Sequence, residues 1–101
     1  MMVMDINTAL KRIIETGKVN IGTEKALKDV ANGKAKVVIM ANNCPKKNKE
    51  RIEKSVQAKG VELIRYKGTA LQLGEACGKP FLVAALSITD VGNTPLGELK
   101  T

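Results

Sequence analysis

The spacing of hydrophobic positions changes repeatedly along this chain. Near the start, Ile6, Leu10 and Ile13 recur at the interval of one helix face, and Gly17 follows as a stop signal. Residues 37–41 are instead apolar at every position, which is typical of a strand buried on both faces of a sheet. The pattern therefore predicts that helices and strands alternate.

The Gly and Pro residues between these segments set the expected boundaries. A first helix ends at Gly17, and further helices are expected over Thr23–Asn32, Pro45–Lys59 and Gly68–Cys77. Strands are expected over Val19–Ile21, Val37–Ala41, Val61–Tyr66 and Phe81–Ile88, followed by a loose end from Asp90 to Thr101. Strict alternation predicts an α/β protein, a three-layer α/β/α sandwich with a four-stranded mixed sheet.

Length and composition fit one folded domain over residues 1–101. The first residues lack the basic leader and apolar run of a signal peptide, and no stretch approaches transmembrane length. Cys44 and Cys77 are far apart, and the chain has no histidine to complete a common zinc set. We therefore expect a cytosolic protein with two free thiols and neither a metal nor a cofactor.

The formal net charge is +7, with no histidine. Such an excess favours nucleic acid first and an anionic membrane surface second, although a merely solubilising surface is the plainer explanation. Without histidine, Ser-His and Cys-His nucleophile pairs are impossible. The segment from Gly22 to Lys25 also lacks the glycines of a P-loop or dinucleotide fingerprint. A binding protein is thus favoured, and a small α/β enzyme or nucleotide-binding module is the alternative from another class.

Three candidate binding segments lie near expected strand ends, where ligand sites gather in open α/β sheets. Gly22 precedes a helix start that suits an anion, and Lys25 and Lys28 share one face of that helix. Asn43 carries both a donor and an acceptor for a base edge. Phe81 offers a flat face to an unstacked base.

Each candidate also has a plainer interpretation. Gly22 can simply ease a turn, the lysines can simply be solvated, and Asn43 can cap a turn. Phe81 can belong to the core. Composition and spacing leave these alternatives open.

Several segments, in their order and spacing, carry a resemblance that covers nearly the whole chain. They are Thr16-Gly17-Lys18, Gly22 to Lys28, Gly33 to Ile39, Ala41 to Pro45, Leu73 to Lys79, and Phe81 with its apolar strand. With these segments the chain resembles the kink-turn RNA-binding family of ribosomal and small-ribonucleoprotein proteins, and in particular its archaeal and eukaryotic large-subunit branch. The resemblance implies an α/β/α sandwich whose target is a kink-turn, a sharply bent RNA internal loop with sheared G·A pairs and an extruded nucleotide.

The resemblance places part of the RNA site at the start of the second helix. It implies that Gly22 and Thr23 let this helix approach the RNA backbone. Lys28 would contact a phosphate or a guanine edge, and Lys25 would add a phosphate contact. The small-ribonucleoprotein branch has an Asn-Glu pair where this chain has Glu24 and Lys25, which favours the ribosomal branch. Glu24 is expected either to orient a lysine or to accept a hydrogen bond from a base.

For the rest of the site, the resemblance implies that Asn43 bonds a guanine and that Phe81 stacks where the RNA bends, with Val83 lining the same end of the sheet. The implied function is a non-enzymatic structural constituent of the cytoplasmic large ribosomal subunit. Its partners would be ribosomal RNA and other ribosomal proteins, without membrane or DNA, and the free protein would be a monomer. The alternative within the family is a kink-turn-binding component of a small guide-RNA ribonucleoprotein.

Overall fold

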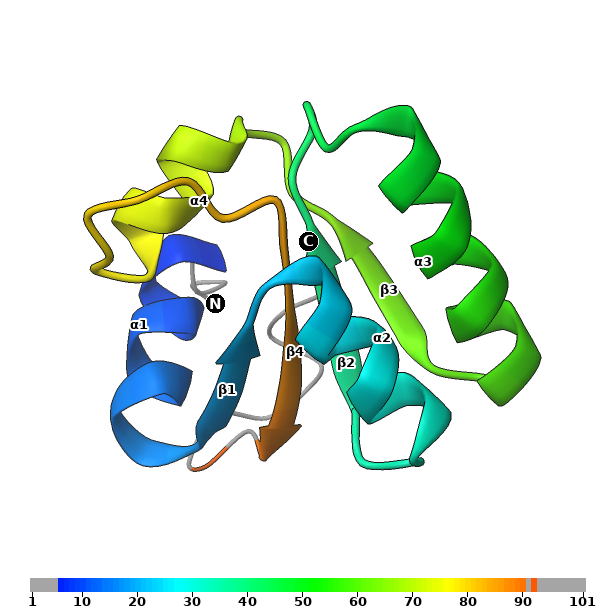
Figure 1. Ribbon diagram of the computed structural model, residues 1–101. Coiled ribbons are helices and arrows are strands. Elements are labelled where there is room, and N and C mark those ends of the chain that lie inside the picture. Colours follow the sequence, from blue (N-terminus) through cyan, green and yellow to red (C-terminus); the bar gives the residue numbers. More distant parts are fainter. Residues whose placement is uncertain (1–5, 91, 93–101) are drawn as a thin grey trace, which may run out of the picture.

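Helices and strands alternate along the chain in the computed structural model, which describes residues 6–90 and 92 (Figure 1). The helices are α1 (Ile6–Thr16), α2 (Thr23–Ala31), α3 (Lys46–Lys59) and α4 (Ala70–Ala76). The strands are β1 (Lys18–Ile21), β2 (Val37–Met40), β3 (Glu62–Arg65) and β4 (Ala85–Asp90). Apart from Asp90 and Gly92, the segment expected to form a loose end lies outside the described residues.

The strands form one mixed sheet in the order β1-β4-β2-β3. Strands β2 and β3 are parallel, whereas β4 runs antiparallel to both β1 and β2. Helices α1 and α4 cover one face of the sheet, and α2 and α3 cover the other (Figure 1). The predicted α/β/α sandwich with a four-stranded mixed sheet is therefore confirmed.

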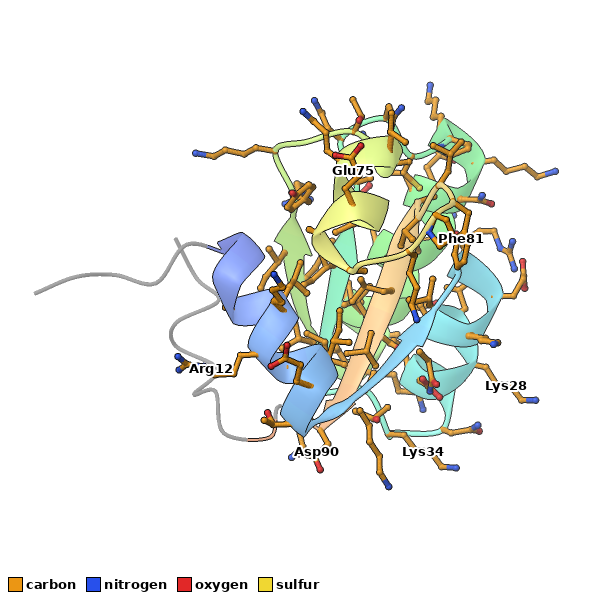
Figure 2. The ribbon with its side chains drawn as sticks, turned by 90° about the vertical axis from the view of Figure 1, so that its left-hand side faces the viewer. Arg12, Lys28, Lys34, Glu75, Phe81 and Asp90 are labelled. Atoms are coloured by element: carbon orange, nitrogen blue, oxygen red, sulfur yellow. The ribbon has the colours of Figure 1, made fainter. Side chains whose placement is uncertain are left out.

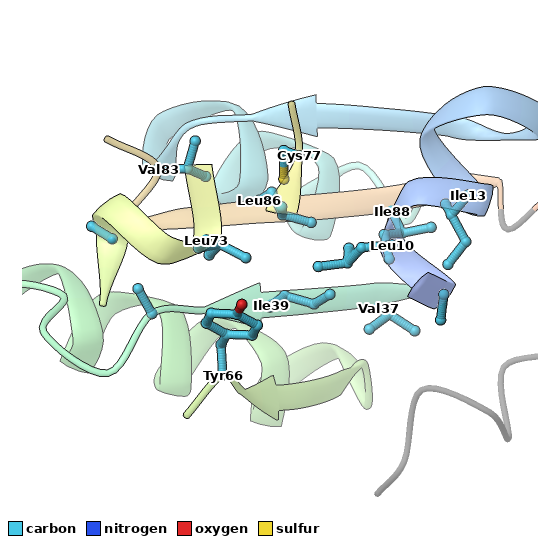
Figure 3. Packing of buried hydrophobic residues seen from close by; sticks show 13 residues of the cluster. Leu10, Ile13, Val37, Ile39, Tyr66, Leu73, Cys77, Val83, Leu86 and Ile88 are labelled. Carbon is cyan, nitrogen blue, oxygen red and sulfur yellow. The ribbon is translucent and has the colours of Figure 1, made fainter. Parts of the chain in front are cut away.

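Alternate residues of β2 supply two separate hydrophobic cores. Val37 and Ile39 pack with α1 and α4, in the cluster drawn in Figure 3. Val38 and Met40 pack on the opposite side with α2 and α3. All four residues of the strand are buried. The continuous apolar run of β2 thus reflects burial on both faces, as the sequence predicted.

The last strand is shorter than the sequence predicted. It begins at Ala85 and not at Phe81, although residues 81–86 are all apolar. The backbone N–H of Val83 donates to the carbonyl of Ala70 in the first turn of α4, at 3.0 Å. Because residue 83 is bonded to a helix, the segment from Phe81 to Ala84 lies outside the sheet ladder.

One end of the sheet collects the segments of interest. It is formed by the carboxyl ends of β1, β2 and β3 and by the start of the antiparallel β4, and it is uppermost in Figure 1. The N–H of Gly22 donates to the carbonyl of Ala85 at 2.9 Å. The N–H of Ala41 donates to the carbonyl of Ala84 at 2.8 Å. These bonds join the segments after β1 and β2 to the start of β4, and we call this region the site end of the sheet.

Candidate nucleic-acid interface

Gly22 forms the turn from β1 into α2 at the site end. Its φ of 119° lies in the region that favours glycine, and no atom lies within 4 Å of the position that a Cβ would occupy. The conformation of the turn, and not crowding inside the protein, therefore requires glycine here. Gly22 therefore eases the turn, as the plainer interpretation proposed, and the space where its side chain would lie is open.

The first turn of α2 carries backbone donors beside that open space. Its first helical hydrogen bond runs from the N–H of Ala26 to the carbonyl of Gly22, at 2.9 Å, and Gly22 has no side chain to cap the helix. The N–H groups of Thr23, Glu24 and Lys25 thus precede the first bond, the arrangement that suits an anion. The side chains of Lys25 and Lys28 are exposed, and neither is in an ion pair within the described residues.

Glu24 is paired with an arginine of α3. Its Oε1 accepts from Nη1 of Arg51 at 2.9 Å and its Oε2 accepts from Nη2 at 3.2 Å, a two-pronged contact. The hydrogen bond and the charge of Arg51 lower the pKa of Glu24, and the same pair raises the pKa of Arg51. The expectation that Glu24 orients a lysine is wrong, because the side chain that it contacts is Arg51. A base contact by Glu24 stays a prediction.

Asn43 lies in the loop between β2 and α3 and reaches the start of α4. Its Oδ1 accepts a hydrogen bond of 2.7 Å from the backbone N–H of Ala70. Thr69 caps the same helix start, since its Oγ1 accepts from the N–H of Gln72. Asn43 is therefore partly structural, although it caps the start of a distant helix and not the turn that the plainer interpretation predicted. Its amino group has no partner among residues 6–90 and 92, and so two donors remain on an exposed residue.

Phe81 is half exposed, with 52% of its surface accessible, which excludes the interpretation of Phe81 as a core residue. Gly74 in α4 explains how the segment is held, because a Cβ at Gly74 would collide with the carbonyl oxygen of Phe81. The missing side chain lets this segment lie directly on the helix. Figure 2 shows Phe81 and Lys28 on one side of the molecule and Arg12 on the other.

Val83 requires a correction. It lies at the site end, but only 1% of its surface is exposed, and it belongs to the core cluster that contains Leu73 and Leu86 (Figure 3). Its side chain offers no surface to a ligand. Val83 instead anchors the segment that carries Phe81 to the core.

Sequence reasoning missed a polar anchor beneath α2. Asp29 is buried, and its Oδ2 accepts hydrogen bonds from Nδ2 of Asn20 at 2.6 Å and from Oγ of Ser87 at 2.7 Å. These bonds fix α2 to β1 and β4, and so they fix the helix start beside Gly22. The available signal was an acidic residue next to Val30 in the apolar stripe of the helix. Arg51 was also missed, and no local signal indicated its partner 27 residues away.

The described part of the chain has no cluster of metal ligands, and its two cysteine thiols are buried. Within it, no group of three His, Cys, Asp or Glu side chains converges on one point. Cys44 and Cys77 are buried free thiols. Burial raises the pKa of both, and nearby Lys49 and Lys79 respectively offset part of that increase. Among the described helices, none has both the length and the apolar character needed to cross a membrane.

Residues 4–96 match the model of the ribosomal protein L7Ae/L30e/S12e/Gadd45 family. A large ribosomal subunit protein eL30 from Methanospirillum hungatei is 41% identical and aligns over 96% of this chain and 99% of that protein. The proteins of the same name from Methanosarcina mazei and Methanocaldococcus jannaschii are 39% and 38% identical, over 94% and 95% of this chain and 88% and 87% of theirs.

A solved structure shows the same fold. A protein with unknown function from Bacillus halodurans C superposes with a TM-score of 0.80, covering 95% of this chain and 90% of that one. Its 18% sequence identity limits the likeness to the fold.

The family match spans nearly the whole chain, and the eL30 relatives are similar over nearly the whole of both sequences. The family is one of ribosomal proteins and not of enzymes, in agreement with the expectation of a non-enzymatic protein. The chain therefore belongs to the ribosomal protein L7Ae/L30e/S12e/Gadd45 family.

Proposed function

We propose that this protein is a structural constituent of the large ribosomal subunit and that it binds a kink-turn in ribosomal RNA. The first half of the proposal is supported by relatives named large ribosomal subunit protein eL30, which align over 94–96% of this chain. In that role the protein works inside the ribosome, with ribosomal RNA and neighbouring ribosomal proteins as partners.

The observation that supports kink-turn binding is the set of RNA-binding groups at the site end of the sheet. Three segments distant in sequence supply these groups. They are the start of α2 with Lys25 and Lys28, the remaining amide donors of Asn43, and the exposed ring of Phe81. Ala70 ties two of these segments together, because its N–H donates to Asn43 and its carbonyl accepts from Val83. A phosphate contact, a base-edge contact and a stacking surface are what a protein needs to bind folded RNA.

The same groups favour a bent RNA over a regular duplex. In a duplex the base faces are stacked on one another, so the ring of Phe81 has nothing to stack on. A kink-turn has a sharp bend and an extruded nucleotide, and so it exposes a base face close to bent backbone. In this arrangement Lys25 and Lys28 supply affinity through phosphates, while Asn43 and Phe81 supply selectivity.

The RNA that the protein carries in its own cells tests this proposal. The tagged protein is isolated from those cells, and the RNA crosslinked to it is sequenced. A variant with both Asn43→Asp and Phe81→Ala serves as the background sample. Enrichment of one large-subunit ribosomal RNA segment with a kink-turn is expected over that background. Enrichment of small guide RNAs would support the alternative ribonucleoprotein, and enrichment of neither would contradict RNA binding through this site.

A further inference from the structure

Helix α3 holds more than half of the formal charge of the protein. It has six basic and two acidic side chains, a net charge of +4 out of +7 for the whole chain. By the same count α1 carries +1, α2 is neutral and α4 carries −1. The residues of the proposed RNA site lie outside α3, so that site leaves most of this charge unexplained.

The charge of α3 is concentrated on its exposed side. Lys47, Arg51 and Lys54 stand four and three residues apart and so share one helix face. All three are exposed, whereas Ile52 and Val56 on the opposite face are buried. Within the part of the chain that the structure describes, Lys47 and Lys54 have no ion-pair partner, although Glu50 lies on the same helix. A surface that only solvates the protein would be expected to pair more of its charges along the helix.

This charged face is continuous with the site end of the sheet. Lys46, the first residue of α3 and also exposed, follows Asn43 by three positions. Arg51 is fixed to Glu24 in the first turn of α2 by two hydrogen bonds. A guanidinium has five N–H donors, and this contact uses one from each terminal nitrogen. Three donors therefore remain, in a position fixed beside the proposed site.

We infer that Lys46, Lys47, Arg51 and Lys54 form a second phosphate-binding surface, which takes the RNA backbone that runs on from the kink-turn, and that Glu24 positions Arg51 in it. This inference rests on the proposed function and extends it from a local motif to the adjoining RNA stem. It also gives Glu24 a role: this carboxylate at an RNA site holds a guanidinium in place.

The first test compares two charge-matched double variants. The first combines Lys47→Gln and Lys54→Gln. The control combines Lys11→Gln and Arg12→Gln, which removes the same charge from exposed residues of α1 in the opposite layer. Affinity for a kink-turn RNA with full-turn stems is measured across salt concentrations. Raising salt from about 50 to 200 mM should weaken the wild type about tenfold more than the α3 variant, since each phosphate contact contributes about threefold over that range. Equal effects of the two double variants would overturn the surface.

The second test uses the sign of the effect of Glu24→Gln. Removing a negative charge from an RNA-binding surface should strengthen binding if charge alone matters. If Glu24 positions Arg51, the variant instead binds more weakly than the wild type, and its affinity falls about threefold less between about 50 and 200 mM salt, which is the loss of one phosphate contact. That loss should vanish when Arg51→Gln is already present. Tighter or unchanged binding would overturn the positioning role, as would an equal loss in both backgrounds.

Binding of the wild type to a kink-turn and to a duplex of the same length distinguishes failure of this inference from failure of the proposed function. If the wild type does not prefer a kink-turn over a duplex of the same length, the proposed function fails. The comparison of the two double variants on that duplex still tests α3, because phosphate contacts do not require the kink. A lower salt dependence only in the α3 variant would then support a general phosphate-binding surface and overturn its link to the kink-turn.

Discussion

Asn43 has one observed role and one proposed role at the site end, and two substitutions separate them. Its Oδ1 accepts from the N–H of Ala70 at 2.7 Å, while its amino group points away from that bond. Asn43→Ala removes both groups. Asn43→Asp keeps an acceptor for Ala70 but replaces the amino group by an oxygen, which cannot donate to RNA.

The expected stability changes follow from the bond to Ala70. Losing an acceptor at a helix start costs about 1 kcal/mol, which for a domain of this size lowers Tm by about 4–8 °C. We expect that loss for Asn43→Ala. Asn43→Asp should keep a Tm close to that of the wild type, because its carboxylate accepts the same bond beside the positive end of α4.

The expected RNA affinities follow a different order. A base-edge contact contributes about 1–3 kcal/mol, so both variants should bind a kink-turn about 5- to 150-fold more weakly than the wild type. Thermal unfolding and a fluorescence-anisotropy titration give the two quantities. Because Asn43→Asp also adds a negative charge, the titration is repeated at high salt, where repulsion is screened and a lost base contact is not. Wild-type affinity of Asn43→Asp at high salt would refute the base contact. An unchanged Tm for Asn43→Ala would refute the structural one.

Three further predictions follow from exposure and charge. Phe81→Ala should weaken kink-turn binding by about 1–3 kcal/mol in a titration, with little change in Tm because the ring is half exposed; unchanged affinity would contradict stacking. Lys28→Ala should lower the slope of log affinity against log salt by about 0.7–0.9, whereas Arg12→Ala, on the opposite side of the molecule in Figure 2, should not; equal slopes would remove Lys28 from the site. Because burial raises the pKa of Cys44 and Cys77, stability should fall as the pH rises from the ordinary thiol range through their raised values, and native thiols should react with iodoacetamide more slowly than denatured ones; equal rates would contradict their burial.

The strands of the sheet were predictable where the hydrophobic pattern of a segment allowed only one kind of element. Residues 37–41 are all apolar, which predicted a strand buried on both faces, and β2 is such a strand. The same reasoning failed at residues 81–84, which are equally apolar. There the cause is outside the segment, because the N–H of Val83 donates to the carbonyl of Ala70, and Gly74 of α4 leaves room for the backbone of Phe81. A pattern along one segment holds no information about a gap in another.

In the candidate site too, features set by neighbouring residues were predictable and features set by distant residues were not. The turn at Gly22 could be inferred from neighbouring residues, whereas the sequence left Phe81 open between a core position and an exposed one. The partner of Glu24 could not be inferred, because Arg51 belongs to another helix and both side chains are long enough to reach several oppositely charged groups. The burial of Val83 depends on how α4 packs over the start of β4, which only the assembled fold determines.

The central claim is that the site end recognises bent RNA and not nucleic acid in general. The most direct measurement compares affinity for a kink-turn RNA with affinity for the same RNA after its G·A pairs are replaced by Watson–Crick pairs, at one salt concentration. If Asn43 and Phe81 each contribute about 1–3 kcal/mol only in the bent form, the kink-turn should bind at least about thirtyfold more tightly. Equal affinities would contradict the claim and leave only a basic protein that binds any RNA backbone.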